Sequence, residues 1–319
     1  MIGLLELTLL SGSLIALVAW ACTVLRVGAS LNASARPNVR SARARAWLYA
    51  PLWVPATVVF AATLSGLTDA LLGRGDHCHV GGGVHHHLCV LHPPAITNHP
   101  LAWFIIAATL TPAAWVVARA ALRAHERWRL SRALIRSSRP SELGGDVRLL
   151  EQDEPVALTV GVFRPVVLLS TGLIDMVSAR TLRIVLTHER AHVRRRDTTW
   201  ALLDQVTAAL LPRPIRGALL GDLVLARERA CDAVAASAEG DVHVAAALVQ
   251  VARMGLSEPA CGVSIGASSI EARVLHLLEG PARGSSWPGW PMACVLALAV
   301  AGVGPAHAWI EQAIALLIH

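Results

Sequence analysis

The stretch Leu186–Val193 reads LTHERAHV and contains two histidines four residues apart, with a glutamate directly after the first. The preceding residues 179–185 predict a helix that continues through this stretch, so His188 and His192 lie on one helical face. Two neutral imidazoles in this arrangement can bind one zinc ion, and Glu189 lies beside them as a candidate general base. Because H-E-x-x-H fixes only three positions, a polar helix surface with two unrelated histidines remains the alternative.

A second pair of acidic residues follows on another predicted helix. Glu228 and Asp232 are four residues apart in ARERACDA, residues 226–233, so both carboxylates share a helical face. Catalytic zinc sites use three protein ligands, and Glu228 fits as the third beside the two histidines. Asp232 fits as a carboxylate that accepts a hydrogen bond from a ligand histidine and fixes its tautomer. The alternative is a solvated charged surface whose acids pair with neighbouring arginines.

Together the two motifs resemble those of gluzincin metallopeptidases, and their surroundings are similar to the BlaR/MecR-type integral membrane zinc metallopeptidases. Four segments carry the resemblance: VGVFRPVVLLSTGLIDMVSARTLRIVLTHE (160–189), HERAHVRRRDTTW (188–200), RERACDA (227–233) and SSIEARVLHLLEG (268–280). The similarity extends over most of residues 1–310, and the two motifs are its specific part.

This resemblance implies a zinc endopeptidase with one Zn²⁺ per chain, bound by His188, His192 and Glu228. It implies that Glu189 is the catalytic residue and that Asp232 orients a ligand. The reaction would be zinc-assisted hydrolysis of peptide bonds, in which the glutamate takes a proton from water and passes it to the leaving amine.

Short apolar segments before the first motif predict β-strands at residues 147–150, 156–160 and 165–170, followed by a turn at Thr171-Gly172. In gluzincins, the strand beside the zinc site binds an extended substrate as an additional strand. By resemblance, the candidate substrate-binding residues are Leu158, Thr159, Val160 and Gly161. An ordinary core strand is the alternative for this segment.

The rest of this region predicts helices. Residues 200–211 and 215–225 predict a helical hairpin, either two buried helices or a pair that dips toward the membrane. Residues 233–254 predict one alanine-rich helix, in which His243 is interpreted as an ordinary histidine rather than a group that stabilises an oxyanion. Asp197 follows three arginines and is interpreted as part of a structural ion pair.

The composition is that of a membrane protein. Of 319 residues, 54% are apolar, and the mean hydropathy is +0.52, which is high for a soluble domain. The formal charge of +6 comes from arginines that cluster beside apolar runs, so the positive-inside rule explains them without nucleic-acid binding.

Four apolar runs predict transmembrane helices at about residues 2–25, 47–72, 101–118 and 290–309. The basic segments 26–46 and 119–139 follow the first and third runs, which places both segments in the cytoplasm and the N-terminus outside. We therefore expect a mainly α polytopic protein of the cell membrane with four transmembrane helices and a cytosolic α+β gluzincin zinc-protease domain. Its expected domains are residues 1–118 with three transmembrane helices, 119–289 with the cytosolic peptidase, and 290–319 with the fourth transmembrane helix and a short external tail.

The predicted external loop, residues 73–100, contains seven of the fourteen histidines and two cysteines, Cys78 and Cys89. Imidazole clusters bind zinc, copper or nickel, so the loop is a candidate site for an external metal or ligand. A glycine-rich loop with an incidental histidine tract is the alternative. Whether the two cysteines form a disulfide stays open.

The resemblance implies that a cytosolic protein is cleaved, such as a BlaI-type transcriptional repressor in a signalling pathway. The β-lactam sensors of that family carry a penicillin-binding domain after the last span, whereas this sequence ends at His319 without an S-x-x-K motif, so direct β-lactam sensing is not expected. The alternatives are a quality-control membrane metalloprotease of the heat-shock or prenyl-protein-processing type, and a non-catalytic metal-sensing receptor. The expected partners are the protein substrate and membrane lipid, without direct nucleic-acid contact; homo-oligomerisation stays open.

Overall fold

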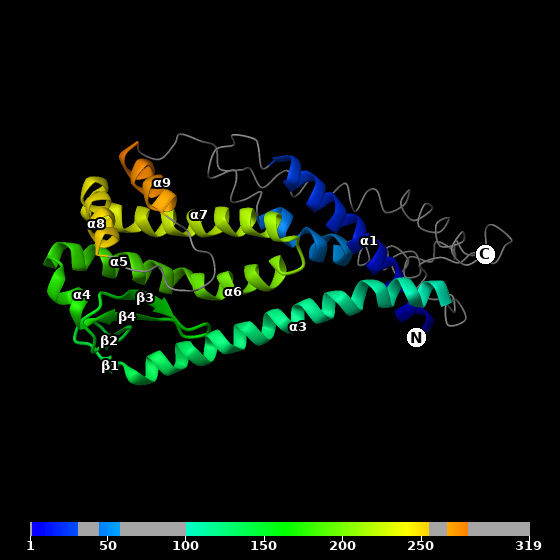
Figure 1. Cartoon of the computed structure of the whole chain (residues 1–319), viewed down its shortest axis with the longest axis horizontal. Helices are drawn as coiled ribbons and strands as arrows, with labels where there is room; N and C mark the ends of the chain where they lie inside the picture. The colour runs from blue at the N-terminus through cyan, green and yellow to red at the C-terminus, as the bar shows by residue number, and fades with distance from the viewer. Residues whose placement is uncertain (1, 31–44, 58–99, 255–266, 280–319) are drawn as a thin grey trace, which may run out of the picture. The chain divides into compact units, whose positions relative to one another are not determined.

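The computed structural model describes residues 2–30, 45–57, 100–254 and 267–279, which are mainly helical and include a small sheet (Figure 1). They divide into two compact units. One unit contains residues 2–30, 46–57 and 100–116, and the other contains residue 45 together with 117–254 and 267–279. Both candidate metal-binding motifs lie in the second unit.

The first unit consists of apolar helices. Helix α1 (Ile2–Ser30) covers the first predicted span, residues 45–57 are helical, and α3 (Pro100–Ser137) begins in this unit. Among the described residues, Trp103–Ser137 is long and apolar enough to cross a membrane, and Gly12–Arg26 is a shorter apolar helix. Three predicted features lie outside the described residues: residues 58–72 of the second span, the whole fourth span, and the histidine-rich loop 73–99 with its two cysteines. What the sequence predicts for them stays a prediction.

Helix α3 is continuous over 38 residues, although its composition changes from apolar to basic near Ala118. Arginine favours helix nearly as well as leucine does, so the change in hydropathy does not end the helix. Pro112 is accommodated within it. The two units divide within this helix, at residues 116 and 117, close to the predicted domain boundary after residue 118.

The second unit contains a four-stranded sheet in the order β1-β2-β4-β3. Its strands are β1 (Arg139–Pro140), β2 (Val147–Leu150), β3 (Ala157–Val160) and β4 (Val166–Ser170). Strand β4 is parallel to β2 and antiparallel to β3. The three predicted strands are confirmed, and the continuous apolar run of β4 is explained by its central place, where Val167, Leu168 and Leu169 are fully buried. Strand β3 lies at an edge of this sheet.

Six helices complete the second unit: α4 (Thr171–Met176), α5 (Ala179–Arg195), α6 (Asp197–Ala208), α7 (Arg213–Glu239), α8 (Asp241–Arg253) and α9 (Ala267–Leu278). Leu186 of α5 packs with Val147, Val167 and Leu169 of the sheet. On its other side α5 packs against α7 and α8 through Ile184 (Figure 1). Helix α5 is therefore held between the sheet and the other helices.

Two local predictions are wrong. Thr171-Gly172 is the start of α4 rather than a turn, because the Ser170 hydroxyl caps the helix by accepting a hydrogen bond from the Leu173 amide. The predicted helix 233–254 is two helices, because Gly240 has a φ of 90° and separates α7 from α8. The many alanines of this segment favour helix but do not compensate for a residue in that conformation.

Gly172 offers a test of the packing around α4. A Cβ atom at this position would overlap the carbonyl oxygen and carbon of Asp153, which belong to rigid backbone. We expect Gly172→Ala to reduce the free energy of unfolding by about 1–3 kcal/mol, the usual cost of overpacking. Thermal unfolding of the full chain in detergent micelles measures this as a lower melting temperature. Gly145→Ala is the control, since a Cβ there meets nothing within 4 Å; equal melting temperatures for the two variants would contradict the predicted overlap.

Candidate metal centre

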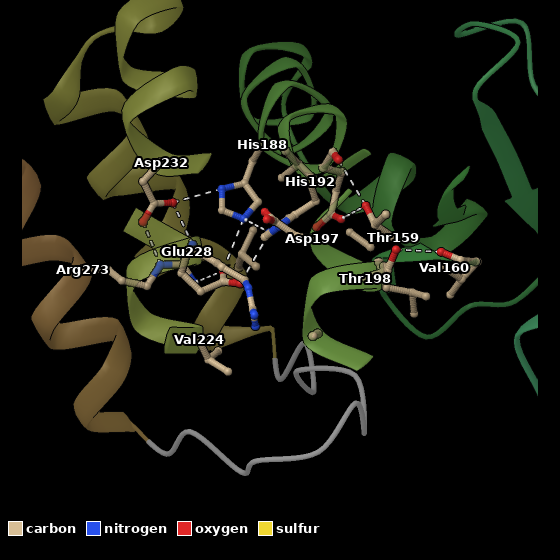
Figure 2. A pocket seen from close by; sticks show the side chains of 18 of the residues that line it. Thr159, Val160, His188, His192, Asp197, Thr198, Val224, Glu228, Asp232 and Arg273 are labelled. Atoms are coloured by element: carbon tan, nitrogen blue, oxygen red, sulfur yellow. Dashed lines mark hydrogen bonds and ion pairs between the residues drawn. The ribbon is translucent and has the colours of Figure 1, made fainter. Parts of the chain in front are cut away.

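Three side chains from two helices converge in the second unit (Figure 2). The Nε2 atoms of His188 and His192 on α5 are 3.2 Å apart. Glu228 on α7 completes the group, since its Oε2 lies 3.4 Å from His188 Nε2 and its Oε1 lies 3.4 Å from His192 Nε2. One potential ligand atom from each residue lies within 4.8 Å of the others. The structure thus brings together the three residues that the sequence predicted as metal ligands.

The packing of α5 against α7 produces this convergence. On α5, the four-residue spacing places both histidines on the same face, while Leu186 on another face is buried against the sheet. On α7, the same spacing places Glu228 one turn before Asp232, so both carboxylates face α5.

Each histidine uses its Nδ1 atom for a carboxylate. The distance from His188 Nδ1 to Asp232 Oδ1 is 3.0 Å, and that from His192 Nδ1 to Asp197 Oδ2 is 2.9 Å. A carboxylate at Nδ1 fixes the orientation of the ring and directs Nε2 toward the shared point. Two oriented imidazoles and one carboxylate are a donor set that suits a divalent ion such as zinc.

The role of Asp197 was missed in the sequence. The predicted ion pair is present, with Arg195 Nε 3.1 Å from Asp197 Oδ2, but the same oxygen accepts the hydrogen bond of His192. Asp197 begins α6, and Arg196 before it adopts a left-handed conformation with a φ of 54°. This turn returns the chain toward the histidine.

Cys231 on α7 places a buried thiol next to the Nδ1 side of His192. Cys231 Sγ is 3.3 Å from His192 Nδ1 and 3.6 Å from Asp197 Oδ2. Burial raises the pKa of the thiol, and the negative charges of Asp197 and Glu228 raise it further. Cys231 therefore remains protonated and donates to Asp197.

Arg273 on α9 contacts both carboxylates of α7 (Figure 2). Its Nε and Nη2 atoms donate to the two oxygens of Asp232 at 2.8 and 2.7 Å, and its Nη1 lies 3.0 Å from Glu228 Oε2. Burial raises the pKa of Asp232, but the hydrogen bonds from Arg273 and His188 outweigh burial and lower that pKa below its usual value. Asp232 is therefore a carboxylate at neutral pH. Arg273 has no predicted role in the sequence, because 41 residues separate it from Asp232.

Glu189 is linked to the edge of the sheet. The Thr159 hydroxyl donates to Glu189 Oε2 at 2.7 Å and lies 3.1 Å from the Glu189 carbonyl oxygen. Glu189 and Thr159 line a cavity of about 330 Å³ together with the three candidate ligands. Most of the remaining lining is apolar and comes from α3, α6, α8 and α9. His243 lies outside this lining, where it bonds Arg180 and the Glu239 carbonyl.

The four predicted substrate-binding residues differ in where their backbone points. Leu158 and Val160 lie opposite Leu168 and Val166 in the register of β3 and β4. Two residues before Leu158, Val156 and Ser170 form a hydrogen-bonded pair, in which Ser170 N donates to Val156 O. Because bonded pairs alternate along an antiparallel ladder, the backbone of Thr159 points away from β4. Gly161 follows β3 with a φ of 99°, and its carbonyl accepts a hydrogen bond from Thr198 at 2.7 Å. Thr159 is thus the member of this set whose backbone faces the open edge beside Glu189.

Comparison with known proteins identifies a family. A protein-family model described as BlaR1 peptidase M56 matches residues 99–276, which is more than half of the chain. The match includes both motifs, the sheet and Arg273. Searches of curated proteins and of solved structures found no match.

Asp197 provides a test of the metal centre. Loss of a carboxylate partner of a metal-binding histidine typically weakens metal affinity about 10–100-fold. We expect this loss for Asp197→Asn, measured with purified full-length chain by competition against a chromogenic chelator. Asp146→Asn is the matched control, because that carboxylate pairs with Arg190 of the same helix at the surface. Parent affinity in Asp197→Asn would show that His192 does not depend on this bond.

Proposed function

The chain belongs to the BlaR1 peptidase M56 family, and from this membership we propose that it is a membrane-embedded zinc endopeptidase. The observation that carries the proposal is the convergence of His188, His192 and Glu228, whose ligand atoms lie within 4.8 Å of one another. The carboxylate of Glu189 lines the same cavity. These residues come from two helices separated by α6, so no single segment of sequence would produce their proximity.

The two histidines and Glu228 would hold the zinc ion. When bound, zinc supplies Lewis-acid chemistry, because it makes water more acidic and polarises a carbonyl group. The chain's own contribution is orientation: Asp232 and Asp197 fix the two imidazole rings through their Nδ1 atoms. The apolar lining of the cavity limits competing water, which strengthens electrostatic interactions inside it.

Glu189 is the proposed general base. The Thr159 hydroxyl binds its Oε2 atom, so the carboxylate has a defined orientation beside the histidines. Glu189 accepts the proton of the attacking water while the oxygen forms a bond to the scissile carbonyl carbon. It then donates that proton to the leaving amine nitrogen as the carbon–nitrogen bond breaks, which returns Glu189 to its ionised form.

The edge of β3 is the proposed site for the substrate backbone. An extended peptide can add to an open sheet edge through main-chain hydrogen bonds. The outward backbone of Thr159 would bind such a peptide, while Leu158 and Val160 hold the strand to β4. This arrangement places the substrate backbone next to Glu189.

The proposed topology has four transmembrane helices, with the N-terminus outside and the peptidase unit in the cytoplasm. The long apolar helix within α3 and the family membership support association with a membrane. The arginines that follow the apolar part of α3 support a cytoplasmic location of the second unit.

The proposed substrate is a cytosolic protein, such as a BlaI-type transcriptional repressor. The proposed location of the cavity in the cytoplasm makes cytosolic proteins accessible, and the resemblance to BlaR/MecR-type peptidases favours a regulator. The histidine-rich loop, residues 73–100, is the proposed external site for an inducing metal or ligand.

The general base can be tested without removing the metal. We expect Glu189→Gln to retain zinc and to lose about 10²–10⁴-fold in peptidase activity, because the amide cannot accept the proton. Zinc content and peptide cleavage would be measured on the same purified full-length preparation. Glu142→Gln is the control, since Glu142 is exposed and lies outside the cavity lining. Unchanged cleavage by Glu189→Gln would assign the base to another residue.

The substrate class can be tested in cells. Proteomes of cells that express the parent chain or Glu189→Gln should differ, under inducing conditions, in the amount of an intact winged-helix repressor. We expect the repressor to be cleaved only with the parent chain. If misfolded membrane proteins were cleaved instead, the chain would be a quality-control protease and the repressor proposal would be wrong.

A further inference from the structure

One arginine from α9 lies between the two carboxylates of α7. Arg273 is only 7% exposed, and three of its nitrogen atoms contact three different oxygens: both oxygens of Asp232 and Oε2 of Glu228. We propose that Arg273 is a positioning residue of the metal centre, which fixes Glu228 directly and His188 through Asp232. This inference rests on the proposed zinc peptidase and adds a residue that lies outside both sequence motifs.

The two carboxylates require a cation at this place. Glu228 and Asp232 lie one turn apart on the same helical face, and the Asp232 side chain is 1% exposed. The Glu228 side chain is 22% exposed, so the two negative charges repel each other with little water to reduce the repulsion. The guanidinium of Arg273 supplies the compensating charge from the side opposite to the histidines (Figure 2).

The contacts of Arg273 reach two of the three candidate ligands. Glu228 is contacted directly at 3.0 Å. Asp232 receives two parallel hydrogen bonds from the arginine, and its Oδ1 also lies 3.0 Å from Nδ1 of His188. The third ligand, His192, has a separate support in Asp197 and Cys231. Loss of Arg273 should therefore disturb one half of the centre and leave the other half intact.

The geometry favours arginine over lysine. A guanidinium offers several N–H groups in a rigid plane, so it can bind one carboxylate with two atoms and a second carboxylate with a third. An ammonium group has a similar charge but cannot bond to Asp232 at two points and to Glu228 in the same arrangement.

Helix α9 is held in place by contacts that do not involve the carboxylates. Leu277 is buried in the core cluster that includes Ile184 of α5 and Val244 of α8. Arg229 of α7 donates to the carbonyl of Ala272 at 3.0 Å. Because these contacts fix the helix, replacement of the Arg273 side chain tests the guanidinium itself rather than the docking of α9.

The test compares Arg273→Lys and Arg273→Gln with the parent chain, each purified as full-length protein in detergent micelles. Zinc affinity is measured by chelator competition, and the visible absorption spectrum of the Co²⁺ form reports on ligand geometry. We expect zinc affinity to fall about 10–100-fold in both variants, with an altered Co²⁺ spectrum. The lysine variant keeps the positive charge, so it remains informative if the glutamine variant does not fold, as judged by the melting temperature without metal.

The matched control is Arg183→Lys. Arg183 also joins α5 to α7, through an ion pair with Glu239 at 2.9 Å, but its side chain is 56% exposed and lies away from the cavity. We expect its zinc affinity and Co²⁺ spectrum to match those of the parent. Parent-like affinity and spectrum in Arg273→Lys would overturn the role of Arg273 alone. A parent chain that binds neither zinc nor Co²⁺ would instead overturn the proposed function, and this inference with it.

Discussion

The candidate metal centre depends on the packing of α5 against α7, which places three polar ligand atoms together inside a largely apolar region. Buried polar groups destabilise a protein unless each has a partner. Each ligand here has one: His188 bonds Asp232, His192 bonds Asp197, and Glu228 contacts Arg273. Positively charged side chains contact these carboxylates, which therefore remain ionised despite burial. The fold around the centre is therefore a scaffold that satisfies these groups while their ligand atoms still face one another.

The elements around α5 and α7 each contribute different residues to the site. The sheet supports α5 from one side through Leu186, and its edge strand β3 provides Thr159, which binds Glu189. Helix α6 begins with Asp197, and α9 contributes Arg273. The cavity also includes Trp128 from the basic half of α3.

The sequence predicted the part of the site that depends on local geometry. Helical spacing alone placed His188 beside His192, and Glu228 beside Asp232, because residues four apart share a face. Strands 147–150 and 165–170 were recognisable from their apolar, β-branched residues. Asp197 could not be assigned, since its place depends on the left-handed conformation of Arg196, an arginine for which nothing in the sequence indicates a positive φ. Arg273 could not be assigned either, because its contacts arise only from the tertiary docking of α9. The break at Gly240 was overlooked because the surrounding alanines favour helix.

The arrangement of His188, His192 and Glu228 around one zinc ion can be measured directly by X-ray absorption at the zinc edge. The sample is the full-length chain loaded with one equivalent of zinc. Two imidazole rings and further oxygen neighbours, all at about 2.0–2.2 Å, are the expected first coordination shell. A sulfur neighbour at about 2.3 Å, which Cys231 beside His192 could supply, or a shell made of histidines alone would contradict the assignment of His188, His192 and Glu228 as the ligands.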